Sequence, residues 1–70
     1  MKVFPVGDTK KFYYSDWSFT RGKEYEIELD NSDDEYVTDD EGFKLWISFN
    51  HKTGLWYAPG YNRYKFKVIE

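Results

Sequence analysis

The segment Ser18–Leu29, SFTRGKEYEIEL, decides the fold class of this chain. Gly22 marks a turn, and after it glutamate alternates strictly with an apolar residue. The alternation places Tyr25, Ile27 and Leu29 on one side of an extended strand and the glutamates on the other. Because the side chains of a strand switch faces at every residue, this pattern predicts a β-sheet with one buried face and one acidic, solvated face.

A second alternating segment begins at Phe43 and ends at Phe49. We expect a strand with Phe43, Leu45, Ile47 and Phe49 toward the core and with Lys44, Trp46 and Ser48 on the opposite face. The turn sequence Asp39–Gly42 precedes it, and a short strand is expected before that turn at Tyr36–Thr38. These two strands and their turn predict a β-hairpin.

Three further short strands are expected at Lys2–Val6, Leu55–Tyr57 and Tyr64–Ile69. Pro5 cannot donate to a sheet ladder, so the first of them should be an edge strand. In the last strand Tyr64, Phe66 and Val68 should face the core, while the cations between them face solvent. The aromatic run Lys10–Trp17 fits either a strand or one helical turn.

Length and composition favour a single small domain. Seventy residues form at most one domain, here residues 1–70, and so short a chain buries only about 60% of its unfolded surface. Six Phe, seven Tyr and three Trp can make its core dense. The absence of cysteine excludes disulfides and thiolate metal sites and fits a reducing cytoplasm. We expect an all-β fold, a small SH3-like barrel of five or six short antiparallel strands, because closure protects sheet edges.

Two stretches carry a resemblance to a known family. FTRGKEYEI, residues 19–27, enters the first strand, and YVTDDEGFKLWIS, residues 36–48, spans the hairpin, with an acidic loop between them. This order resembles small, uncharacterised SH3-like barrel proteins encoded by bacteriophages, over Ser18–Phe49. The resemblance implies a barrel fold and a phage origin. It brings no catalytic residues with it.

Charge is segregated along the chain, although the net charge is only -3. Residues 24–41 hold ten acidic and no basic residues, whereas residues 42–69 hold five basic and no acidic ones. One interpretation is that Glu24, Glu26 and Glu28 face Lys65 and Lys67 as cross-strand pairs. The other is that acidic and basic groups occupy separate faces, one of which binds a partner.

The acidic segment is the leading candidate site. We expect Trp46, on the solvent face of its strand, to form a partner-binding surface with Asp30, Asp33, Asp34, Glu35, Asp39, Asp40 and Glu41. Asp30, Ser32, Asp34 and Glu41 match positions 1, 3, 5 and 12 of a calcium loop, but Glu35 stands where that loop requires glycine. No metal is therefore predicted. The segment could instead mimic nucleic acid, or serve solubility alone.

The basic, aromatic C-terminal half supports an alternative. Single-stranded nucleic acid is bound by rings that stack on bases and cations that neutralise phosphates. The residues that would do so are Lys44, Trp56, Tyr61, Arg63, Lys65 and Lys67. A third alternative is a structural virion component that self-assembles through an unpaired strand edge.

Catalysis has little support in the sequence. His51 is the only histidine and lies in a predicted turn. The carboxylates lie in loops and on solvated faces, where their pKa values should stay ordinary. We expect no cofactor, membrane-spanning segment or signal peptide, because the sequence has no glycine-rich phosphate motif and no apolar run long enough for either segment. We expect a non-enzymatic phage accessory protein in the cytoplasm of an infected bacterium, which binds a host bacterial protein and could thereby inhibit it.

Overall fold

The computed structural model describes residues 1–6 and 17–69, without the side chains of residues 62 and 63. This part of the chain is all-β and contains no helix, which confirms the predicted class. The strands are β1 (Lys2–Val6), β2 (Tyr25–Glu26), β3 (Glu28–Leu29), β4 (Glu35–Thr38), β5 (Lys44–Trp46), β6 (Ser48–Asn50), β7 (Leu55–Ala58) and β8 (Tyr61–Val68). Within the described residues no helix is long and apolar enough to cross a membrane.

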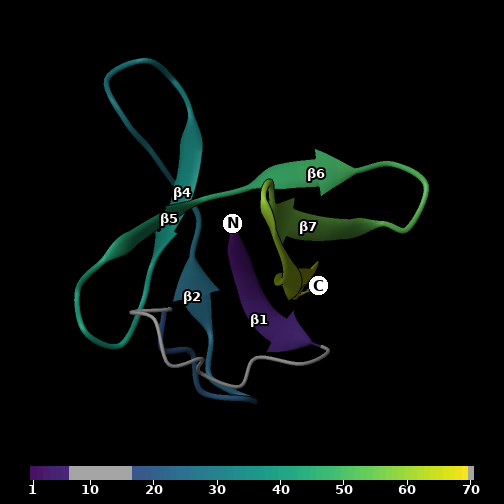
Figure 1. The fold of residues 1–70 in the computed structure, drawn as a ribbon, viewed down its shortest axis with the longest axis horizontal. Helices are drawn as coiled ribbons and strands as arrows, with labels where there is room; N and C mark the ends of the chain where they lie inside the picture. Colours follow the sequence, from purple (N-terminus) through teal and green to yellow (C-terminus); the bar gives the residue numbers. More distant parts are fainter. Residues whose placement is uncertain (7–16, 70) are drawn as a thin grey trace.

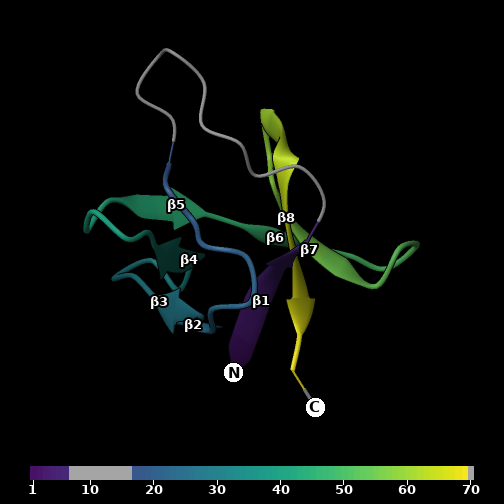
Figure 2. The ribbon, with the colours of Figure 1, turned by 90° about the horizontal axis from the view of Figure 1, so that it is seen from below.

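The strands form two antiparallel sheets. The larger has the order β2-β1-β8-β7-β6 and the smaller the order β3-β4-β5 (Figure 1). The two long alternating segments are each divided between the sheets, because β2 gives way to β3 at Ile27 and β5 to β6 at Ile47. Backbone bonding continues at both breaks: the N–H of Ile27 donates to Met1 (2.8 Å) and that of Ile47 to Glu35 (3.0 Å). Figure 2 shows the smaller sheet set to one side of the β7–β8 hairpin.

The core lies between the sheets and consists largely of aromatic and branched side chains. Its buried members are Val3, Phe19, Tyr25, Val37, Leu45, Ile47, Trp56, Ala58, Tyr64 and Phe66. Alternation predicted several of these buried positions correctly, among them Leu45 and Phe66. Phe19 joins this core from a segment that is not a strand, which the sequence pattern did not indicate.

The predicted burial is wrong at the ends of the alternating segments. Leu29 is 61% exposed, Phe43 64% and Phe49 37%, although all three were expected in the core. Leu29 is the last residue of β3 before a loop, and Phe43 precedes β5. A side chain at the end of a strand can point to the correct face and still find no second sheet opposite it. Leu29 and Phe43 therefore stay in contact with solvent. Phe49 lies instead at the centre of β6, the last strand of the larger sheet, where its ring packs against Trp56 (5.4 Å) and is only partly covered.

β1 is not the edge strand that Pro5 suggested. Val3 pairs with Tyr25 of β2 on one side and with Val68 of β8 on the other. β2, however, reaches only as far as Val3, so Pro5 pairs with Phe66 of β8 and has no strand on its other side. Proline is tolerated at such a position because no neighbour requires its missing N–H.

The predicted pairing of Glu24, Glu26 and Glu28 with Lys65 and Lys67 does not occur, because β1 separates β2 from β8. Lys2 instead lies 3.9 Å from Glu24, and the terminal ammonium of Met1 contacts Glu26. The hydrogen bond from this ammonium lowers the pKa of Glu26. These glutamates are therefore not paired with the cations of β8, although the acidic and basic segments do meet where β4 pairs with β5 and Thr38 lies opposite Lys44. Of the aromatic run Lys10–Trp17, all but Trp17 lies outside the described residues.

Candidate functional site

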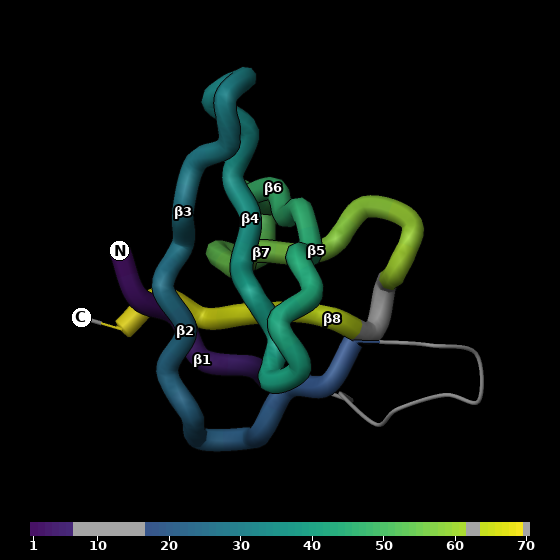
Figure 3. The backbone as a smooth tube through the Cα atoms, turned by 90° about the vertical axis from the view of Figure 1, so that its left-hand side faces the viewer, coloured from purple at the N-terminus to yellow at the C-terminus, as the bar shows by residue number. Residues whose placement is uncertain are grey.

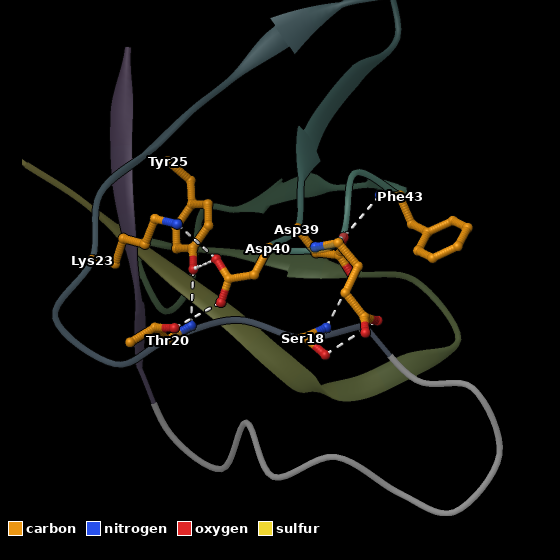
Figure 4. Close-up of polar contacts among 8 residues, drawn as sticks. Ser18, Thr20, Lys23, Tyr25, Asp39, Asp40 and Phe43 are labelled. Carbon is orange, nitrogen blue, oxygen red and sulfur yellow. Dashed lines mark hydrogen bonds and ion pairs between the residues drawn. The ribbon is translucent and has the colours of Figure 1, made fainter.

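The turn between β4 and β5 is organised by the carboxylate of Asp39. This side chain is buried, with 5% of the residue exposed. Its Oδ1 accepts hydrogen bonds from the backbone N–H groups of Glu41 (2.9 Å) and Phe43 (2.8 Å), and its Oδ2 accepts one from Ser18 (2.9 Å; Figure 4). Asp39 therefore faces into the protein, contrary to the solvent-exposed position expected for a binding carboxylate.

The neighbouring carboxylate, Asp40, is equally engaged with the rest of the fold. It accepts hydrogen bonds from Thr20 Oγ1 (2.7 Å), Lys23 Nζ (2.9 Å) and the hydroxyl of Tyr25 (2.7 Å; Figure 4). The hydrogen bond from Thr20, followed by those from Lys23 and Tyr25, lowers the pKa of Asp40 to about 2. The expectation that the carboxylates keep ordinary pKa values is wrong here. Such a group is fully ionised at neutral pH and anchors the turn to residues 20–25.

This geometry predicts an acid-sensitive contribution to stability. We expect Asp40→Asn to lower the free energy of unfolding by about 1–2 kcal/mol at pH 7, because three donors lose a charged acceptor. The folded pKa, about 2, lies below the ordinary value of 3.8, so the contribution is present above pH 4 and is lost as pH falls toward 2. Urea titrations of both proteins at several pH values measure this difference. A difference that stays constant down to pH 2 would contradict the assignment.

The loop between β3 and β4 carries the exposed acids and projects from the body of the protein (Figure 3). Asp30 shapes it, since its Oδ1 accepts from the N–H groups of Ser32 (2.8 Å) and Asp34 (2.9 Å). These bonds, the one from Asp34 first, lower the pKa of Asp30. Asp33 occupies a left-handed conformation, with φ of 62°. The Asp33 and Asp34 side chains are exposed, so they are accessible to a partner.

Trp46 stands beside this loop on the outer face of the smaller sheet. As predicted, it is exposed, at 45%. Its Nε1 donates to Asp30 Oδ2 (2.8 Å), and its ring centre lies 5.6 Å from that of Tyr36 on the adjacent strand. Lys44 Nζ lies 4.8 Å from the same Tyr36 ring. The indole is thus fixed from two sides while much of its surface faces solvent.

A shallow depression of about 300 Å³ adjoins the indole. It is lined by Asp34, Glu35, Trp46, Ile47, Ser48 and Pro59. Three residues of the predicted partner-binding surface, Asp34, Glu35 and Trp46, therefore line the same hollow. Tyr36 was missed as the support of the indole, because a four-residue turn at Asp39–Gly42 would place it opposite Leu45, whereas the observed register places it opposite Trp46. Glu41, the seventh predicted acid, lies instead on the Asp39 turn, where it accepts a bond from Ser18 Oγ (3.5 Å).

The residues of the nucleic-acid alternative are not gathered into one surface. Trp56 is buried in the core, at 7% exposure, and cannot stack on a base. Lys44 belongs to the smaller sheet, whereas Lys65 and Lys67 are exposed on β8. Tyr61 is exposed and packs edge-on against Trp17, with ring centres 4.8 Å apart. The side chain of Arg63 lies outside the described residues.

One further hollow, of about 510 Å³, lies against β8 and is lined by Asn50, Thr53, Leu55, Tyr57 and Lys65. It holds a single cation and no exposed aromatic stack. Among the described residues, no group of three or more His, Asp or Glu side chains is placed to hold a metal ion.

Comparisons with protein-family models, with curated proteins and with solved structures give no match to this chain.

Proposed function

We propose that this chain is a non-enzymatic protein-binding module that recognises a basic surface through Trp46 and the β3–β4 loop. The observation that carries the proposal is the state of Trp46, which is 45% exposed yet held by Asp30 and packed on Tyr36. Tryptophan is among the commonest hot-spot residues of protein interfaces. A side chain that is already fixed loses little conformational freedom on binding, so its contact surface is used efficiently.

The charges around this indole indicate the chemistry of the partner. Asp33 and Asp34 are exposed, and Glu35 borders the same hollow. Lysine or arginine side chains of a partner could pair with these carboxylates and lie over the indole ring. An acidic loop that projects from the body also accelerates encounter with a basic surface. Asp39 and Asp40 contribute to folding in this proposal and not to binding.

The finer fold and the origin belong to the same proposal. We propose that the two sheets form one SH3-like barrel. Two observations support this proposal. The chain passes directly from one sheet to the other at Ile27 and at Ile47, and the last strand, β8, pairs with the first strand, β1. The resemblance to phage proteins favours a bacterial host protein as the partner, bound in the cytoplasm of the infected cell. Binding would inhibit the host protein if it covers a surface that this protein needs for its own activity.

A pull-down from nuclease-treated bacterial lysate tests the function. We expect the wild-type chain to retain one host protein, identified by mass spectrometry and then titrated by calorimetry. Trp46→Ala should weaken that complex at least tenfold, because the truncation removes the central anchor. Asp33→Lys combined with Asp34→Lys should weaken it similarly and reduce its salt dependence.

The matched control is Lys65→Glu combined with Lys67→Glu, two equally exposed positions on the other sheet. This variant should bind the partner as wild type does. Retention of the host protein by the Trp46 variant at full affinity would refute the proposed surface. The nucleic-acid alternative would be favoured if the proteins retained in the pull-down are lost after nuclease treatment and are also lost with the Lys65→Glu, Lys67→Glu variant. An empty wild-type sample together with a concentration-dependent oligomer in light scattering would favour self-assembly.

A further inference from the structure

β6 leaves one side of its backbone unpaired among the described strands. It is the last strand of the larger sheet and pairs only with β7, from Ser48 opposite Tyr57 to Asn50 opposite Leu55. In Figure 1 no other ribbon runs along the far side of β6. An unpaired strand edge presents backbone donors and acceptors that can pair with another extended chain.

The direction of these groups follows from two hydrogen bonds. The N–H of Ile47 donates to Glu35, on the β4 side, whereas the carbonyl of Asn50 accepts from Gly54, on the β7 side. The backbone groups of successive residues in a strand point to alternate sides. The N–H and C=O of Phe49 therefore point to the same side as the N–H of Ile47, where no other described strand pairs with β6.

The open side of β6 begins where the candidate site ends. β4 accompanies the β5–β6 segment as far as Glu35 opposite Ile47 and then continues into the acidic loop. The hollow beside Trp46 lies at this fork, since Asp34 and Glu35 come from one branch and Ile47 and Ser48 from the other. A strand added to β6 would therefore have these carboxylates at one end and the exposed Phe49 ring along its length.

We propose that the partner is recognised through an extended, basic segment that adds as a strand to the free edge of β6. This inference rests on the proposed function and specifies how the partner is bound. The backbone of Phe49 would exchange two hydrogen bonds with one residue of the segment. Because side chains of an added strand alternate, lysine or arginine should recur at every second position near Asp34 and Glu35.

A displayed library of random twelve-residue peptides tests this inference without knowledge of the partner. We expect selected peptides to carry lysine or arginine at alternating positions and to bind the protein reversibly. In synthetic versions, N-methylation of the single peptide N–H that meets Phe49 should weaken binding at least tenfold, because it removes one ladder bond. The same methyl group one residue further along should have little effect, since that N–H points away from the edge.

Amide exchange on the protein provides the second measurement. Saturating peptide should slow exchange of the Phe49 N–H at least tenfold more than it slows the N–H of Val37, in the centre of β4, which reports only the general stabilisation by binding. Phe49→Pro should abolish binding, since proline is tolerated at a free edge but cannot donate. Should that variant unfold, the exchange and N-methylation measurements on wild-type protein still decide the matter.

The alternatives give different results. In one outcome, peptide binding depends on Trp46 and Asp34 but is not weakened by N-methylation at any position. This result would overturn strand addition and would leave the proposed function in place. A library that yields no binder, or binders that leave Phe49 exchange unchanged, would also overturn it, while the pull-down judges the function separately. Protection of Phe49 without peptide, accompanied by a dimer in light scattering, would assign the edge to a second copy of the chain and exclude the proposal.

Discussion

Replacing Phe19 by alanine should lower the free energy of unfolding by about 4 kcal/mol, a loss typical of a buried phenylalanine. Phe19 is 7% exposed and lies at the centre of an aromatic cluster. Its ring meets those of Tyr25 (5.0 Å), Tyr64 (5.9 Å) and Phe66 (5.0 Å) edge-on. Alanine would remove three favourable ring contacts and leave a cavity between strands β2 and β8. Urea denaturation followed by tryptophan fluorescence measures the loss.

Phe43→Ala is the matched control, because it removes the same side chain from a position that is 64% exposed. This change should alter the free energy of unfolding by no more than about 0.5 kcal/mol. A chain of this size has a total stability of only about 4–10 kcal/mol, so the Phe19 variant could be partly unfolded at 25 °C. The comparison is then made at lower temperature or with osmolyte. Similar losses in both variants would show that Phe19 is not a core residue.

Phe19 also shows where sequence patterns stop being informative. Alternation gives the face of a side chain only within a strand, and Phe19 lies in an irregular segment. Its burial depends on the last strand, far away in the sequence, passing over it. The same limit explains the ends of strands. Tyr25 and Leu45 were predicted correctly, whereas Leu29 has the right periodicity but no sheet opposite it.

The candidate site was predictable in part. The exposure of Trp46 followed from its place on the face opposite Leu45 and Ile47, and the exposure of Asp33 and Asp34 followed from their loop. Composition could not separate these acids from Asp39 and Asp40, which have the same chemistry. What distinguishes Asp39 and Asp40 is contact with residues 18–25, and that contact depends on how the hairpin packs against a distant segment.

Asp39→Ala should lower the free energy of unfolding by about 3 kcal/mol, since three partly buried backbone N–H groups lose a charged acceptor and hydrogen bonds to charged groups are worth more than neutral ones. The substitution leaves the N–H groups of Ser18, Glu41 and Phe43 without the carboxylate that they share. Two of these close the β4–β5 turn, and the third ties that turn to the segment that carries Phe19. Thermal and urea unfolding measure the effect.

Two controls separate this role from charge alone. Asp33→Ala removes the same charge from the exposed loop and should change stability by no more than about 0.5 kcal/mol. Asp39→Asn keeps one carbonyl oxygen for the turn but presents an amide N–H₂ to Ser18, so it should lose roughly half as much stability as the alanine variant. Equal effects of Asp33→Ala and Asp39→Ala would mean that net charge, and not the shared acceptor, determines stability. If Asp39→Asn matches wild type, the bond from Ser18 to Asp39 contributes nothing, and the turn is then tied to the segment before β2 through its other bonds, among them those of Asp40.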